Sequence, residues 1–162
     1  MNVKIRTIIP EDNLVLAKII RASLEEFGAN KPGTVYFDSS TDHLSEVFKE
    51  PKSIYFVCIE NNIVVGGAGI FPTKGLPTDT CELVKMYLDA GARGKSYASL
   101  LLQKCFDFAV SYGYQNIYLE TLPELSKAVH IYEKYGFQYL NTPLGSSGHF
   151  GCDIRMLKTL SV

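Results

Sequence analysis

The spacing of hydrophobic residues in the first third of the chain predicts one strand and two helices. Residues 3–9 alternate apolar and polar side chains with the period of two that is typical of a half-buried strand. The next segment repeats with a helical period after Pro10. Its apolar positions are Leu14, Ala17, Ile20 and Leu24. A loop is expected over residues 28–40, followed by a short helix over residues 41–50.

The middle of the chain predicts three strands and a turn that leads into a long helix. Residues 53–59 and 63–71 are apolar runs separated by a Glu-Asn-Asn turn, which predicts an antiparallel hairpin. Residues 80–89 form a third apolar run, and a turn of small residues follows over 90–95. Residues 96–112 then repeat with a helical period until Gly113.

The last third predicts a crossover and a closing pair of strands. A strand over residues 116–121 follows the long helix, and this strand-helix-strand order predicts a parallel crossover. A helix over residues 125–135 and strands over 137–140 and 150–157 complete the order β-α-α-β-β-β-α-β-α-β-β. The fold class expected is therefore α/β (α+β), a mixed sheet of about seven strands flanked by about four helices.

Composition narrows the class of protein. The 162 residues fit one domain over residues 1–162, and the 46% of hydrophobic residues suffice for a core. Sixteen basic residues against seventeen acidic ones argue against a nucleic-acid or membrane partner, because both favour a basic surface. No apolar run is long enough to span a membrane.

The four cysteines and three histidines predict no metal site. None of them has the spacing of a zinc motif or of a CxxC redox pair. Free cysteines in apolar runs behave as small buried hydrophobes, so we expect reduced core thiols and a cytoplasmic protein. The oligomeric state expected is a monomer or a homodimer.

The turn before the long helix has the features of an anion site. The first backbone N–H groups of a helix lack intrahelical partners, and the helix dipole favours negative charge there. Arg93 and Lys95 add positive charge, and small residues allow a phosphate to approach the backbone. The spacing is neither that of a P-loop nor that of a dinucleotide-binding glycine motif. A turn of this kind is common, so by itself it does not name a ligand.

Two motifs together resemble the GNAT family of N-acetyltransferases. Residues 93–98, Arg-Gly-Lys-Ser-Tyr-Ala, are similar to the family pattern [QR]-x-x-G-x-[GA], with Ser96 at a glycine position. Residues 128–137 are close to the family's A-x-x-[IL]-Y-x-x-x-G-F pattern. The resemblance extends to the predicted element order over nearly the whole chain.

This resemblance implies acetyl-coenzyme A as co-substrate, bound in a gap between the fourth and fifth strands. The residues implied in binding it are Met86, Tyr87, Leu88, Arg93, Gly94, Lys95, Ser96, Tyr97, Ala98 and Ser126. Ser126 lies beside Leu125, where many family members have an asparagine. The reaction implied is direct transfer of the acetyl group to the primary amine of a small molecule or a peptide.

Glu82 and Tyr132 are the candidate catalytic residues. Glu82 lies on an otherwise apolar strand face if the strand alternates regularly, and burial there would raise its pKa toward that of a general base. A bulge would instead turn its side chain toward solvent. The family match makes Tyr132 the candidate acid that protonates the coenzyme A thiolate, whereas its periodicity also fits a core tyrosine.

Glu120, His149 and Phe150 are the candidate acceptor-binding residues. Glu120 ends the fifth strand near the expected gap, and His149 and Phe150 follow a Gly-Ser-Ser-Gly loop. For Glu120, a share in the base role with Glu82 and a solvated carboxylate remain the alternatives. For His149 the alternative is a solvated imidazole. Two other functions also remain open: a non-catalytic acyl-coenzyme A-binding sensor or scaffold on the same fold, and an unrelated nucleotide-binding protein.

Overall fold

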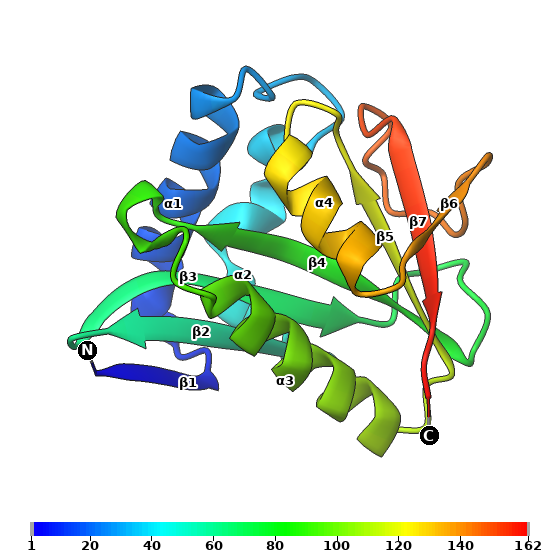
Figure 1. Ribbon diagram of the computed structural model, residues 1–162, viewed down its shortest axis with the longest axis horizontal. Helices are drawn as coiled ribbons and strands as arrows, with labels where there is room; N and C mark the ends of the chain where they lie inside the picture. Colours follow the sequence, from blue (N-terminus) through cyan, green and yellow to red (C-terminus); the bar gives the residue numbers. More distant parts are fainter. Residues whose placement is uncertain (1, 162) are drawn as a thin grey trace.

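The computed structural model describes residues 2–161 and contains one seven-stranded sheet (Figure 1). The strands are β1 (Val3–Thr7), β2 (Ile54–Glu60), β3 (Ile63–Phe71), β4 (Thr80–Leu88), β5 (Asn116–Thr121), β6 (Gln138–Leu140) and β7 (Ile154–Thr159). Their order across the sheet is β1-β2-β3-β4-β5-β7-β6. Strands β4 and β5 run parallel, and the other neighbouring strands pair antiparallel. The expected mixed sheet and its parallel crossover are confirmed.

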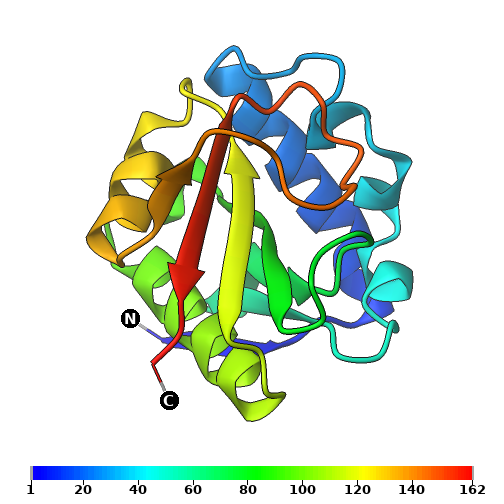
Figure 2. The ribbon, with the colours of Figure 1, turned by 90° about the vertical axis from the view of Figure 1, so that its right-hand side faces the viewer.

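Helices cover both faces of the sheet. The α-helices are α1 (Asn13–Glu26), α2 (Leu44–Val47), α3 (Tyr97–Ser111) and α4 (Ser126–Lys134). Helix α1 packs against one face through Leu16, Ile20 and Leu24. Helices α3 and α4 share a hydrophobic cluster on the opposite face, where Leu101 and Tyr132 are both buried (Figure 1). Figure 2 shows β5 and β7 side by side, with β6 at the sheet edge.

Three details of the expected elements are wrong: the orientation of Leu14, the helix over residues 41–50 and the start of the last strand. Leu14 is 84% exposed, because it is about 120° from Ile20 around the helix and faces away from the sheet. The expected helix over residues 41–50 is a 3₁₀ turn, Ser39–Asp42, followed by the short α2. His43, whose backbone is not helical, separates the two.

The last strand begins at Ile154 and not at Phe150. The backbone of the preceding residues is engaged elsewhere: Gly151 N–H donates to the Gly33 carbonyl at 2.8 Å, and Cys152 N–H donates to the His149 carbonyl at 3.1 Å. The loop before β7 is therefore fastened to the loop that follows α1. The four cysteines are free and buried, as expected.

Candidate active site

The sheet opens between its two parallel strands. Strands β4 and β5 are paired at Thr80 with Asn116, Cys81 with Ile117 and Glu82 with Tyr118, and they diverge beyond that point. Figure 1 shows this opening, with α4 lying over it. A cavity of about 290 Å³ occupies the opening and is lined by both strands, the first residues of α3 and the start of α4. The facing backbone edges of the two strands are therefore available to an extended ligand.

A bulge in β4 sets which side chains enter the cavity. Val84 is opposite Gly69 and Tyr87 is opposite Gly67, so β4 has one residue more than β3 over this stretch. Lys85 lies in the bulge with a left-handed φ of 51°. The Tyr55 hydroxyl donates to the Lys85 carbonyl at 2.8 Å and holds the bulge in place.

The bulge overturns the expectation of regular alternation along β4. Met86 and Leu88 pack on the α3 side of the sheet, whereas Tyr87 packs with the α1 cluster. Glu82 therefore does not share a face with Met86 and Leu88. Its side chain is nevertheless buried, with 3% of the residue exposed, and it lines the cavity.

The environment of Glu82 favours its neutral form. Burial raises the pKa of this carboxyl to about 7, and the negative charge of Glu120 acts in the same direction. A hydrogen bond from the Thr73 hydroxyl to Oε1, at 2.5 Å, and the charges of His149 and Lys85 oppose this shift. The result is a buried carboxyl that changes protonation state near neutral pH.

Glu120 lies close to Glu82 on the adjacent strand and also lines the cavity. Its carboxylate accepts hydrogen bonds from the Tyr118 hydroxyl, at 2.7 Å, and from the Ser147 hydroxyl. The loop before β7 is thus bound to the end of β5, and two carboxyl groups face the same end of the cavity.

The turn over residues 93–98 lies at the other end of the cavity. Gly94 and Ser96 have left-handed φ angles of 75° and 66°, and α3 begins immediately afterwards at Tyr97. The cavity is lined by Arg93, Gly94, Ser96, Tyr97 and Ala98. A helix N-terminus with small residues around it is a site where backbone N–H groups can hold a phosphate.

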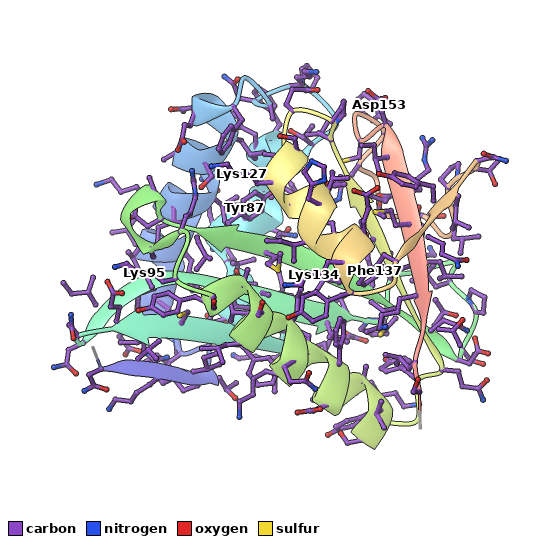
Figure 3. The ribbon with its side chains drawn as sticks, viewed as in Figure 1. Tyr87, Lys95, Lys127, Lys134, Phe137 and Asp153 are labelled. Atoms are coloured by element: carbon purple, nitrogen blue, oxygen red, sulfur yellow. The ribbon has the colours of Figure 1, made fainter. Side chains whose placement is uncertain are left out.

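The two cationic side chains of this turn are both bound by protein carboxylates. The Arg93 guanidinium donates to Glu26 at 2.8 Å and to the Leu88 carbonyl at 3.2 Å. The Lys95 ammonium lies 3.0 Å from Glu60, and Lys95 does not line the cavity. Figure 3 shows Lys95 on the turn, away from Tyr87 and Lys127.

Tyr132 projects from α4 to the cavity wall, with 6% of the residue exposed. Burial raises the pKa of its hydroxyl. The Tyr87 side chain lines the same cavity from the opposite face of the sheet. Ser126, at the start of α4, lines it as well.

His149 and Phe150 lie in the loop before β7 and are not part of the cavity lining. His149 Nε2 is 2.8 Å from Asp38 Oδ2, which fastens this loop to the segment before α2. Phe150 is 79% exposed. The structure therefore brings Glu82, Glu120 and Tyr132 to one cavity and leaves Phe150 at the surface.

Sequence reasoning missed three side chains of the cavity or its surroundings. Lys85 and Lys127 line the cavity, and Thr73 binds Glu82. Figure 3 shows Lys127 near the start of α4. Lys85 stands out in the sequence because it is a charged residue in an apolar strand. Regular alternation, however, assigns it to the face opposite Glu82.

Comparisons with known proteins agree with this geometry. A model of the Acetyltransferase (GNAT) family matches residues 16–137. The uncharacterized N-acetyltransferase YjgM of Escherichia coli K12 is 39% identical over 152 residues, which cover 93% of this chain and 90% of that protein. Human N-acetylaspartate synthetase is 31% identical over 134 residues, 82% of this chain and 39% of that protein. The crystal structure of the PaiA N-acetyltransferase of Thermoplasma acidophilum with coenzyme A has a TM-score of 0.77 at 20% identity and covers 98% of this chain and 99% of that one.

The fold, the open strand pair and the helix N-terminus define an acyltransferase that uses an acyl-coenzyme A. The chain belongs to the GNAT family of N-acetyltransferases. It is thus an acetyl-coenzyme A-dependent enzyme with an amine acceptor. Within residues 2–161 no group of three His, Cys, Asp or Glu side chains is placed to hold a metal ion. In the same range no helix is long and apolar enough to cross a membrane.

Proposed function

We propose that this enzyme acetylates the primary amine of a small molecule or a peptide by direct transfer, with Glu82 as general base and Tyr132 as general acid. The observation that carries the proposal is the Glu82 carboxyl, which is buried in the cavity with a pKa raised to about 7. One relative is named N-acetylaspartate synthetase, and aspartate is an amino acid. Free amino acids are therefore among the candidate acceptors.

Glu82 prepares the acceptor for attack. An alkylammonium is not a nucleophile, so one proton must leave the nitrogen before it can bond to the thioester carbonyl carbon. A carboxylate with a pKa near 7 is ionised often enough to accept this proton at neutral pH and basic enough to hold it. Glu120 and Thr73 tune Glu82, because the former raises its pKa and the latter lowers it.

Tyr132 is suited to protonate the leaving group. Acetyl-coenzyme A supplies the activated acetyl group as a thioester, and its departing sulfur needs a proton. Tyr132 lines the cavity, and its hydroxyl keeps its proton at neutral pH because burial raises its pKa.

The chain has groups that fit both ends of coenzyme A. The backbone of Met86, Tyr87 and Leu88 lies where β4 has left β5, so an extended amide-bearing ligand can bond to this edge. The backbone of residues 93–98 at the start of α3 suits the pyrophosphate. Ser126 and Lys127 at the start of α4 border the same cavity.

The domain organisation, the cellular location and the oligomeric state of the protein also remain predictions. They are a single acetyltransferase domain over residues 1–162, a cytoplasmic location, and a monomer or homodimer without a nucleic-acid partner. The four free cysteines support the second, because reducing compartments keep thiols unpaired.

The base assignment is tested with Glu82→Gln. The wild-type rate should fall as the pH is lowered through about 7, because protonated Glu82 cannot accept the amine proton. The variant should lose about 10²-fold in kcat and lack this acid limb. The measurement is thiol release from acetyl-coenzyme A between pH 5.5 and 9.

The matched control is Glu120→Gln, which removes the other carboxylate of the same cavity. This variant should keep an acid limb but move it to lower pH, because the charge of Glu120 raises the pKa of Glu82. An unchanged limb in Glu82→Gln, or its loss only in Glu120→Gln, would assign the base to a residue other than Glu82.

A further inference from the structure

Lys85 is a buried cation on the cavity wall that the described protein does not fully pair. Its side chain is 7% exposed and lines the cavity at the end where Glu82 and Glu120 lie. Its ammonium forms no hydrogen bond among the described residues, and its one ion pair there, with Asp38 Oδ2, spans 4.0 Å. Burial lowers its pKa, as expected for a desolvated ammonium.

Asp38 is shared between Lys85 and two closer partners. The same carboxylate accepts a hydrogen bond from Ser40 N–H at 2.9 Å and lies 2.8 Å from His149 Nε2. Arg155, which is opposite Glu120 in the β5–β7 register, has a buried Nε atom without a hydrogen-bond partner among residues 2–161. A buried donor such as Arg155 Nε costs free energy unless a ligand or water satisfies it.

The bulge in β4 places Lys85 and Glu82 on one cavity instead of on opposite faces. The two side chains influence each other's charge, yet Glu82 is not an ion-pair partner of Lys85. The cavity end therefore presents separated charges of opposite sign. An acceptor that is only an amine matches the carboxylates and leaves Lys85 with the 4.0 Å contact to Asp38 as its ion pair among the described residues.

We propose that the acceptor carries a carboxylate close to its primary amine, as an amino acid does, and that Lys85 binds this carboxylate while Glu82 faces the amine. The inference rests on the proposed function and adds the class of substrate. The carboxylate of the acceptor would pair with the Lys85 ammonium, and its amine would lie near Glu82 and Glu120. Lys85 is thus a specificity-determining residue.

The first test compares acceptors that differ only in the carboxylate. For each of a panel of amino acids, kcat/KM is measured beside that of its carboxamide and its decarboxylated amine. At least one free amino acid should exceed both analogues by about tenfold or more, because a site built for a polar group rejects the analogue that lacks it. Equal or higher kcat/KM for the analogues throughout the panel would overturn the inference and leave the acetyltransferase reaction standing. Absence of transfer to every acceptor, with acetyl-coenzyme A still bound, would overturn the proposed function itself.

The second test uses Lys85→Met, with Lys104→Met on the exposed face of α3 as the matched control. Lys85→Met should raise KM for the preferred amino acid about tenfold or more, and leave KM for acetyl-coenzyme A and for the decarboxylated amine within about twofold. Lys104→Met should change none of the three. An equal rise in KM for the amino acid and its decarboxylated amine would show that Lys85 only supports the fold. If Lys85→Met does not fold, the wild-type comparison decides alone.

Discussion

Individual residues of this cavity are tuned by burial more than by direct pairing. The pKa values of Glu82 and Tyr132 are raised and that of Lys85 is lowered, so each shift favours the neutral form of the side chain. Burial is the largest cause of all three shifts. A protein that needed only stability would replace such groups with apolar ones. Their presence in one cavity is the reason to assign chemistry to them.

The role of Tyr132 is tested by Tyr132→Phe. The ring packs against Phe137 at 5.7 Å between centroids, and this contact survives the substitution. Loss of the hydroxyl alone should lower kcat by about 10²-fold with little change in acetyl-coenzyme A affinity. Single-turnover rates and equilibrium binding separate the two quantities, and a rate equal to that of the wild type would make Tyr132 a packing residue.

At the scale of elements, the β4 bulge decides what the cavity contains. Tyr55 is fully buried on β2 and reaches across β3 to the Lys85 carbonyl. Gly67 and Gly69 on β3 leave room for its ring, because a Cβ at either position would come within 3.0 Å of ring atoms. Two glycines and a tyrosine on neighbouring strands therefore support one irregular residue of β4.

Tyr55→Phe should loosen this bulge without opening a large cavity. The lost hydrogen bond removes the Tyr55 partner of the partly buried Lys85 carbonyl, which should cost about 1–3 kcal/mol of unfolding free energy. The acceptor KM should rise as Lys85 loses its fixed position. Urea denaturation and steady-state kinetics check the two effects. Stability that falls with an unchanged acceptor KM would show that the bulge does not depend on Tyr55.

At the scale of the whole molecule, helix α1 is fastened to the turn that begins α3. The Arg93 guanidinium bonds to Glu26 at the end of α1, lies 5.0 Å from the Phe27 ring centre, and donates to the Leu88 carbonyl at the end of β4. This arrangement predicts that Arg93 acts by positioning the turn, because its guanidinium is already bound by the protein.

Arg93→Ala should weaken acetyl-coenzyme A binding roughly threefold to tenfold, because a partly exposed ion pair and its hydrogen bonds hold the turn. If Arg93 acts by position, Glu26→Ala should weaken binding similarly, and the double variant should lose little more. Calorimetric titration of all four proteins measures this coupling. A large loss in Arg93→Ala that Glu26→Ala does not share would indicate direct contact with the ligand.

The order of strands and helices was predictable because it depends on local periodicity. The hairpin of β2 and β3, the long α3 and the crossover to β5 follow from residues that are near one another in sequence. The segment before β7 was not predictable in this way, since the Gly33–Gly151 hydrogen bond between distant loops decides it.

The features of the candidate site also fall into those that local sequence patterns predict and those that depend on tertiary contacts. The sequence by itself determined the element order, the turn at residues 93–98, and the family through that turn and the Tyr132 segment, because each is a short pattern. Only the tertiary structure decided that a bulge places Lys85 beside Glu82, that protein carboxylates bind Arg93 and Lys95, and that Phe150 lies at the surface. The physical reason is that each of these outcomes depends on partners from distant segments, which no local pattern of residues encodes.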